Sequence, residues 1–153
     1  MASHREVQDG DVVVADIALG AHGYFGDTAE THVVGSNAEA TEQRARLLEI
    51  LAQAGTELVP GNTGAEVFDA MNRRILESFP GGEFPHHGGH GISVSAFEDP
   101  HLIPTDHTPF ENWMLLAVEP GVYFPGKSGA RVENIFLVTP DGGYELRDVM
   151  GAR

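Results

Sequence analysis

The chain lacks cysteine and has few basic residues. Of its 153 residues, 9 are Lys or Arg and 23 are Asp or Glu, so the formal net charge is −14. This charge argues against nucleic acid or an anionic membrane surface as a partner, because both bind basic patches. The absence of cysteine excludes a disulfide scaffold, a thiolate metal site and a cysteine nucleophile.

Long hydrophobic runs are also missing. No segment reaches the roughly 20 apolar residues that a membrane span requires, and the opening MASHREVQDGD lacks the apolar stretch of a signal peptide. We therefore expect no membrane partner and a cytoplasmic location. A hydrophobic content of 41% in a chain of this length predicts one domain able to bury a core.

The first third of the chain predicts a β-hairpin. Residues 11–19 and 24–34 are rich in β-forming side chains, and the short segment 20–23 between them contains two glycines.

Two helices are expected next. Ser36 or Asn37 is a suitable N-cap for the first. Its apolar residues recur with the helical period at Leu47, Leu51, Ala54 and Leu58. Thr63 and Glu66 have capping-box spacing before the second helix. The apolar stripe of that helix comprises Val67, Met71, Ile75 and Phe79.

Beyond residue 84 the helical period disappears and short strands are expected. The candidates are 92–97, 113–118, 121–124, 131–139 and 144–146, separated by turns that contain Pro or Gly. A hairpin, a helix pair and a further set of strands make an α+β domain.

Four acidic residues interrupt apolar strand segments: Asp16, Asp27, Glu119 and Glu133. A single acid in a strand usually faces solvent, but four in such contexts suggest a shared role. Buried carboxylates are unfavourable unless they are paired or bind a metal ion, and Arg131 is the basic residue close to them in sequence. The pattern therefore implies bound cations.

Histidine is concentrated in one tract, with five of the eight between positions 86 and 107. Such a tract indicates either a metal site or chance enrichment of a loop. The glycines around His90 argue against a helical zinc motif, and GGHG is not a dinucleotide fingerprint. His90 and the four carboxylates form a ligand set that suits Mn, Co, Fe or Zn, and two divalent ions would balance the four negative charges.

Four segments carry a family resemblance. They are GDVVVADIALGAHGYFGDTAET, HHGGHGISVSAFEDP, VEPGVYFP and GARVENIFLVTPDGGYEL, which span most of residues 10–147. In motif and order they resemble the pita-bread metallopeptidases, which include prolidase, aminopeptidase P, methionine aminopeptidase and creatinase. The 14-residue gap between Glu119 and Glu133 is most similar to the prolidase and aminopeptidase P branch.

The resemblance implies a pita-bread fold that is truncated at its N-terminus, with residues 1–153 as one partial catalytic domain carrying the metal-binding portion. It implies five metal ligands. Asp16 would bind one ion, Asp27 and Glu133 would bridge two, and His90 and Glu119 would complete the other. Two divalent ions, Mn or Co with Zn and Fe as alternatives, would activate a water molecule and polarise the scissile carbonyl.

The resemblance also assigns other roles. Glu119 would accept the proton of the attacking water, and His86 would donate to the developing oxyanion. Arg131 would orient the carboxylates from the substrate pocket. Phe97 stands where the family has a histidine that contacts the substrate, so this wall of the pocket is apolar here.

These roles predict a dinuclear metal-dependent Xaa-Pro peptidase that acts on a small peptide and forms a homodimer. Phe97 leaves open a non-peptide hydrolase or lyase of the creatinase-like branch. The short front portion leaves open a catalytically inactive binding module.

Overall fold

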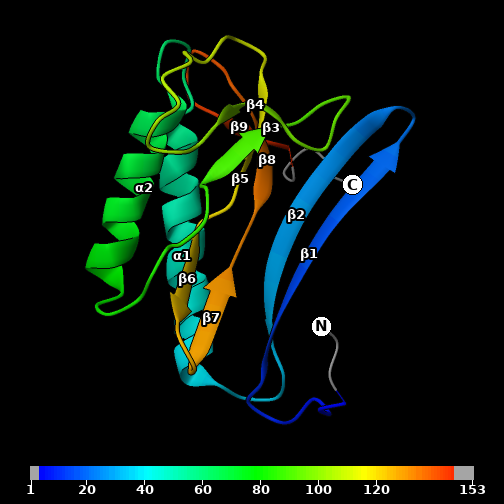
Figure 1. The fold of residues 1–153 in the computed structure, drawn as a ribbon, viewed down its shortest axis with the longest axis vertical. Coiled ribbons are helices and arrows are strands. Elements are labelled where there is room, and N and C mark those ends of the chain that lie inside the picture. Colours follow the sequence, from blue (N-terminus) through cyan, green and yellow to red (C-terminus); the bar gives the residue numbers. More distant parts are fainter. Residues whose placement is uncertain (1–3, 147–153) are drawn as a thin grey trace.

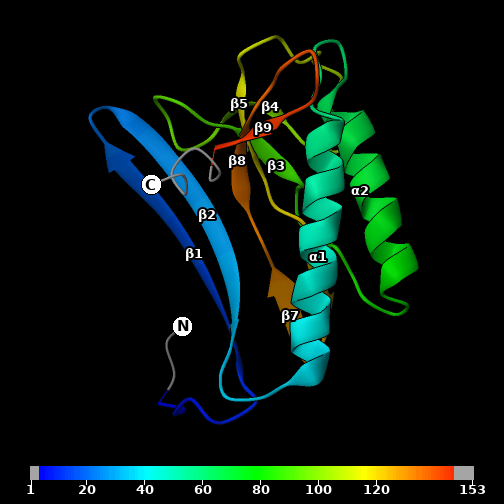
Figure 2. The same cartoon turned by 180° about the vertical axis from the view of Figure 1, so that it is seen from behind.

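The computed structural model describes residues 4–146 and has two helices on one side and a long hairpin on the other. Figures 1 and 2 show the helix pair and the hairpin flanking a set of short strands. The helices are α1, Ala38–Thr56, and α2, Gly64–Ser78. No helix in this described range is long and apolar enough to cross a membrane.

The predicted hairpin is confirmed. Strands β1, Val12–Ala21, and β2, Tyr24–Val33, pair antiparallel along their whole lengths. His22 and Gly23 form the tip with φ angles of 53° and 87°. A two-residue hairpin turn with positive φ at both positions matches the twist of its strands, so the hairpin can be long and regular.

Both predicted helices are confirmed, with their caps. Asn37 is the N-cap of α1, and its side chain accepts a hydrogen bond of 3.0 Å from the Ala40 amide. Thr63 and Glu66 form the capping box of α2. Leu58 lies beyond the end of α1 but is fully buried, because the chain turns back there against the core.

The remaining strands form two small sheets. A five-stranded sheet has the order β4-β3-β5-β8-β9, and β6 pairs with β7. Their bounds are Gly89–Gly91 for β3, Glu98–His101 for β4, Leu115–Val118 for β5, Gly121–Phe124 for β6, Ser128–Arg131 for β7, Asn134–Leu137 for β8 and Tyr144–Glu145 for β9. The strands predicted at 121–124 and 144–146 are present.

The strand predicted at 92–97 is wrong. This segment is a loop between β3 and β4, closed by hydrogen bonds to the Glu98 carboxylate. The Ser93 hydroxyl donates to it at 2.8 Å and the Ser95 amide at 2.6 Å. The Glu98 carboxylate thus satisfies the Ser95 amide, a group that a strand would have used in its ladder.

Two other strand boundaries differ from the prediction. The single strand expected over 131–139 is broken, because the chain changes partner: β7 pairs with β6, and β8 pairs with β5. The strand expected from residue 113 begins at Leu115, since Trp113 has a φ of 74° that an extended strand does not use.

The hydrophobic core lies between the helix pair and the short strands. It contains the predicted apolar stripes of both helices together with buried side chains from β5, β6 and the segment before β8. Fully buried members include Leu47, Met71, Ile75, Leu116, Val118, Val122 and Val132. The core fixes the strands on which the candidate site is built.

Candidate metal centre

The hairpin is attached to the body of the molecule at Glu133. The Glu133 amide donates a 2.9 Å hydrogen bond to the Ala29 carbonyl, and the Thr28 hydroxyl donates one of 2.9 Å to the Glu133 carbonyl. Asp27 is thereby placed next to Glu133. The register pairs Ala18 with Asp27, so Asp16, two residues earlier in β1, lies on the same face of the hairpin.

His90 occupies the middle of β3, which is flanked by β4 and β5. The adjacent glycines allow this close packing. A Cβ on Gly89 would lie 2.1 Å from the Ala117 carbonyl oxygen, and one on Gly91 would lie 2.5 Å from that of Asp99. The glycine-rich motif therefore lets two strands approach the histidine from both sides.

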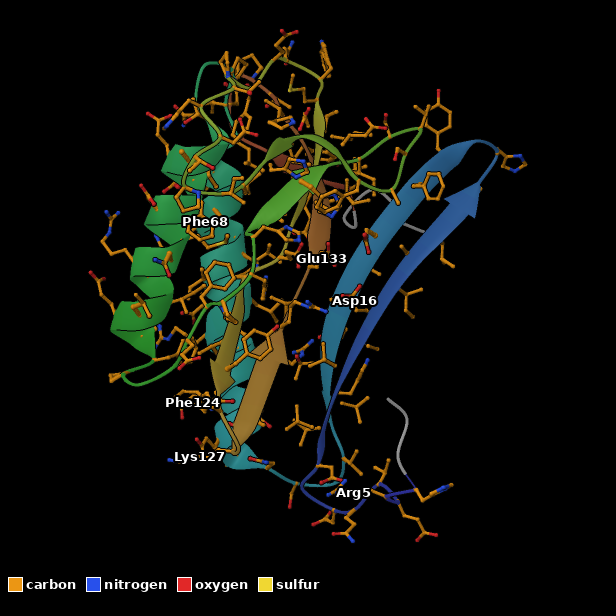
Figure 3. The ribbon with its side chains drawn as sticks, viewed as in Figure 1. Arg5, Asp16, Phe68, Phe124, Lys127 and Glu133 are labelled. Atoms are coloured by element: carbon orange, nitrogen blue, oxygen red, sulfur yellow. The ribbon has the colours of Figure 1, made fainter. Side chains whose placement is uncertain are left out.

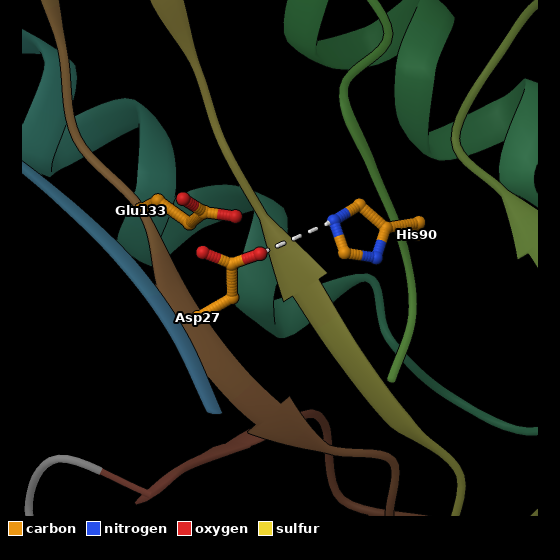
Figure 4. Close-up of side chains that lie close together, drawn as sticks. All are labelled: Asp27, His90 and Glu133. Carbon is orange, nitrogen blue, oxygen red and sulfur yellow. Dashed lines mark ion pairs between the residues drawn. The ribbon is translucent and has the colours of Figure 1, made fainter. Parts of the chain in front are cut away.

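Asp27, His90 and Glu133 converge from three different strand segments (Figure 4). Each offers one ligand atom, and these atoms lie within 4.8 Å of one another. The His90 Nδ1 lies 2.9 Å from the Gly91 carbonyl, which can only accept, so Nδ1 carries the proton. Its Nε2 lies 3.8 Å from Asp27 Oδ2, and in the neutral ring this atom offers the lone pair that a metal ligand requires.

The carboxylates of this site have perturbed pKa values. Burial, together with the charges of Glu119 and Asp27, raises the pKa of Glu133 to about 9. Burial likewise raises the pKa of Glu119 to about 7 and is the largest cause of a raised pKa at Asp27. Without a cation, these groups cannot all be ionised at neutral pH.

Asp27 gives a direct test of whether a cation fits. Its Oδ1 is buried and has no hydrogen-bond partner among the residues that the structure describes. An orphaned carboxylate oxygen beside a buried glutamate and an unprotonated imidazole nitrogen is unfavourable, and a divalent ion would satisfy all three. The donor set of oxygen and nitrogen atoms fits a divalent metal.

Asp16 and Glu119 share one cavity with these three residues. The cavity has a volume of about 220 Å³ and is lined by Asp16, Asp27, His87, His90, Phe97, Glu119, Arg131 and Glu133. Figure 3 shows Asp16 on the hairpin and Glu133 on the neighbouring strand segment. All five predicted ligands are thus brought together, although Asp16 and Glu119 lie outside the group of three.

Arg131 is the cation of this cavity. Its guanidinium forms an ion pair with Asp16, and Nη1 lies 3.7 Å from Glu119 Oε2. Its Nε is buried without a hydrogen-bond partner among the described residues. One positive charge offsets only part of the negative charge of four carboxylates, so the site can accommodate further cations.

Of the two other predicted site residues, Phe97 lines the cavity and His86 does not. His86 is absent from the cavity lining: its Nδ1 donates to the His87 carbonyl at 2.7 Å, and its Nε2 faces the Tyr123 hydroxyl at 3.1 Å. Phe97 lines the cavity, is 53% exposed, and places its ring centroid 4.4 Å from that of His90.

His87 is the cavity residue that the sequence reasoning missed. Its Nδ1 lies 3.2 Å from Glu119 Oε1, and its ring meets Phe97 edge to face at 5.3 Å. Burial lowers the pKa of both His86 and His87. The one signal in the sequence was the doubled histidine, which does not show which ring faces inward.

The chain is similar in sequence to known proteins. Residues 1–140 match the sequence profile of "Metallopeptidase family M24". The "Probable dipeptidase PepE" of Mycobacterium tuberculosis is 34% identical over 149 residues, which cover 95% of this chain and 40% of the relative. The "Xaa-Pro dipeptidase" of Pyrococcus horikoshii is 32% identical over 151 residues, which cover 95% and 42%.

Solved structures agree. The prolidase from Pyrococcus furiosus superposes with a TM-score of 0.87 at 33% identity, over 95% of this chain and 43% of the prolidase. Methionine aminopeptidase from Rickettsia prowazekii superposes with a TM-score of 0.79 at 18% identity, over 94% and 66%, which shows a shared fold alone. The chain spans about two fifths of the length of the curated relatives it matches.

The profile match covers most of the chain, and the superpositions place it on the pita-bread fold predicted from its motifs. The chain corresponds to a part of these longer relatives, and it carries the strands on which the acidic and histidine side chains meet. The chain belongs to metallopeptidase family M24.

Proposed function

We propose that this protein is a dinuclear metal-dependent Xaa-Pro peptidase of the prolidase or aminopeptidase P type. The observation that carries the proposal is the convergence of Asp27, His90 and Glu133 within 4.8 Å, in a cavity that also contains Asp16 and Glu119. Relatives named as Xaa-Pro dipeptidases support hydrolysis next to proline.

The five ligands would hold two divalent ions. Asp16 and Asp27 approach from the hairpin, while His90, Glu119 and Glu133 approach from the body of the molecule. Four carboxylates match the charge of two such ions, and the mixed oxygen and nitrogen donors favour Mn or Co, with Zn and Fe as alternatives. When bound, the ions would lower the pKa of a water molecule and polarise the scissile carbonyl.

The protein's own groups would then handle the proton and the geometry. Glu119 is 5% exposed and lines the cavity, so its carboxylate can accept the proton of the attacking water and pass it to the leaving amine. Arg131 would keep Asp16 oriented through their ion pair. Phe97 would cover one face of His90 and exclude water from it.

His86 remains the proposed donor to the substrate, with one requirement. In this structure its Nδ1 proton is directed to the His87 carbonyl, and Nε2 faces Tyr123. Donation from Nε2 requires a proton on that atom, which only the doubly protonated ring or the other neutral tautomer supplies.

Phe97 favours a second candidate function. It is the one apolar side chain in the cavity lining and cannot donate a hydrogen bond. A non-peptide hydrolase or lyase of the creatinase-like branch, acting on a small substrate, would tolerate this replacement. A catalytically inactive binding module is the third candidate.

Metal analysis and a substrate panel test these functions. The purified protein should retain two divalent ions per chain after dialysis, and Asp27→Ala or Glu133→Ala should lose both ions. Glu77→Gln, an exposed acid on α2, is the matched control and should lose neither. Cleavage of Xaa-Pro dipeptides, with no cleavage of Xaa-Ala dipeptides, supports the peptidase. Bound metal without cleavage of either favours the creatinase-like function, and absence of metal favours the binding module.

We further propose that the chain forms a homodimer through the outer face and the free edge of the hairpin. The register places on that face four exposed apolar residues: Val13, Ile17, Leu19 and Tyr24. Within residues 4–146, β1 pairs only with β2, and its free edge has no proline and no lysine. Such edges favour pairing with another chain. Light scattering should give twice the chain mass, and Ile17→Lys should give the monomer.

A further inference from the structure

The carboxylate of Glu119 is approached by three basic side chains at different distances. The Nδ1 atom of His87 is 3.2 Å from Oε1, whereas the Nδ1 of His86 and the Nη1 of Arg131 are each 3.7 Å from Oε2. The nitrogen of His87 is thus the nearest of the three, although its N–H is aligned with the Gly89 carbonyl rather than with Glu119. Oε1 and Oε2 consequently face different partners.

The proton that each imidazole can offer differs as well. The Nδ1 proton of His86 is committed to the His87 carbonyl at 2.7 Å. The Nδ1 of His87 lies 3.3 Å from the Gly89 carbonyl, a longer contact to an atom that can only accept. His87 therefore carries its proton on Nδ1, where it is bonded to the Gly89 carbonyl, and Glu119 Oε1 is a second acceptor 3.2 Å away.

The local backbone holds His87 in this place. The Glu119 amide donates a hydrogen bond of 2.9 Å to the Gly88 carbonyl. Because Gly88 directly follows His87, this bond holds the backbones of His87 and Glu119 next to each other. Gly88 has no room for a side chain, because a Cβ there would lie 2.3 Å from the terminal methyl of Met71. The backbone bond and the packing at Gly88 thus place His87 beside Glu119.

We infer that His87 is a positioning residue for Glu119: its Nδ1 lies beside Oε1, its proton can turn from the Gly89 carbonyl to Oε1, and Oε2 would then be left to bind a metal ion. The inference rests on the proposed metal site and deepens it, because it concerns how one ligand is oriented. Hydrogen bonds to ligating carboxylates restrict their orientation, and their loss typically weakens metal affinity or activity roughly 10- to 100-fold.

Three substitutions at one position test the inference. His87→Ala removes the donor. His87→Asn places an amide nitrogen near the position of Nδ1, whereas His87→Gln places one near the position of Nε2. His107→Ala changes an exposed histidine of the same tract and is the matched control. Mn²⁺ affinity is measured by isothermal titration calorimetry on the full chain.

We expect His87→Ala and His87→Gln to weaken Mn²⁺ binding by about 10- to 100-fold, His87→Asn to retain most of the affinity, and His107→Ala to match the wild type. Wild-type affinity in His87→Ala, or equal rescue by Gln and Asn, would overturn the inference. If the wild type binds metal but cleaves no Xaa-Pro substrate, the peptidase proposal fails while this comparison still decides the role of His87.

A second measurement does not depend on metal. In EDTA, melting temperatures are recorded for His87→Ala, Glu119→Gln and the double variant. If the two side chains interact, the changes of the single variants will not sum to that of the double variant. Additive changes would show that the two groups are independent, and the inference would fall.

Discussion

Replacing Glu133 with Gln should stabilise the metal-free protein near neutral pH and abolish its stabilisation by metal. Glu133 is 3% exposed, and its pKa is raised from 4.5 to about 9. Between these values the folded protein holds a proton that the unfolded chain releases. The stability is therefore fully present below about pH 4.5 and is lost as the pH rises toward 9.

The size of the effect follows from the shift. At pH 7 the unfavourable contribution is 1.36 × (7 − 4.5), about 3 kcal/mol relative to acid pH. Gln has no charge to bury, so Glu133→Gln should relieve this contribution. For a domain of this size, 1 kcal/mol changes the melting temperature by about 2–4 °C, which gives a rise of about 6–12 °C at pH 7 and none at pH 4.

Metal should close most of the gap in stability between the two proteins. An ion that binds only the folded state at 100 times its Kd stabilises the wild type by about 2.7 kcal/mol. Glu133→Gln loses a ligand and should gain little. Melting curves in EDTA and in Mn²⁺, at pH 4 and pH 7, measure all these changes, with Glu77→Gln as the control. The reasoning would be refuted if Glu133→Gln melted at the wild-type temperature in EDTA at pH 7, or if Mn²⁺ raised its melting temperature as much as that of the wild type.

Three further predictions concern catalysis and the fold. Glu119→Gln should abolish cleavage of an Xaa-Pro dipeptide in a stopped assay with Mn²⁺ present, because the proton acceptor is lost; substantial residual turnover would contradict this role. Phe97→His should raise kcat by up to roughly 10²- to 10³-fold, the effect of one well-placed donor to developing charge, and an unchanged kcat would show that the ring does not reach the substrate. Asn37→Ala should lower the free energy of unfolding by about 1 kcal/mol in urea titration, since the Ala40 amide loses its acceptor; no loss would show that water replaces the cap.

Local features of the sequence determined the elements in the first half of the chain. The hairpin follows from β-forming residues on both sides of a glycine-containing turn, and the helices follow from their caps and from apolar residues at the helical period. These signals act between residues that are close in sequence, so they survive without knowledge of the fold. The spacing of the acids and His90 also indicated a metal site before any contact was known.

The break in the strand expected over 131–139 depends on contacts that no local pattern records. Arg131 still pairs within the β6–β7 hairpin, Glu133 bridges to Ala29, and Asn134 begins the pairing with β5. Most of the other residues of this segment are good strand formers. Only the approach of the long hairpin makes the chain change partner at Glu133 and turn its carboxylate toward Asp27.

The two adjacent histidines are a second case in which tertiary contacts decide what the sequence leaves open. Their identity and spacing are visible in the sequence, but His86 faces Tyr123 and His87 faces Glu119. Which ring enters the cavity depends on the backbone bond between Glu119 and Gly88 and on the packing of Met71 against Gly88. Sequence supplied the chemical groups of the site. Tertiary packing between segments separated in sequence decided which of them meet, because a side chain's direction is set by the neighbours against which its backbone is held.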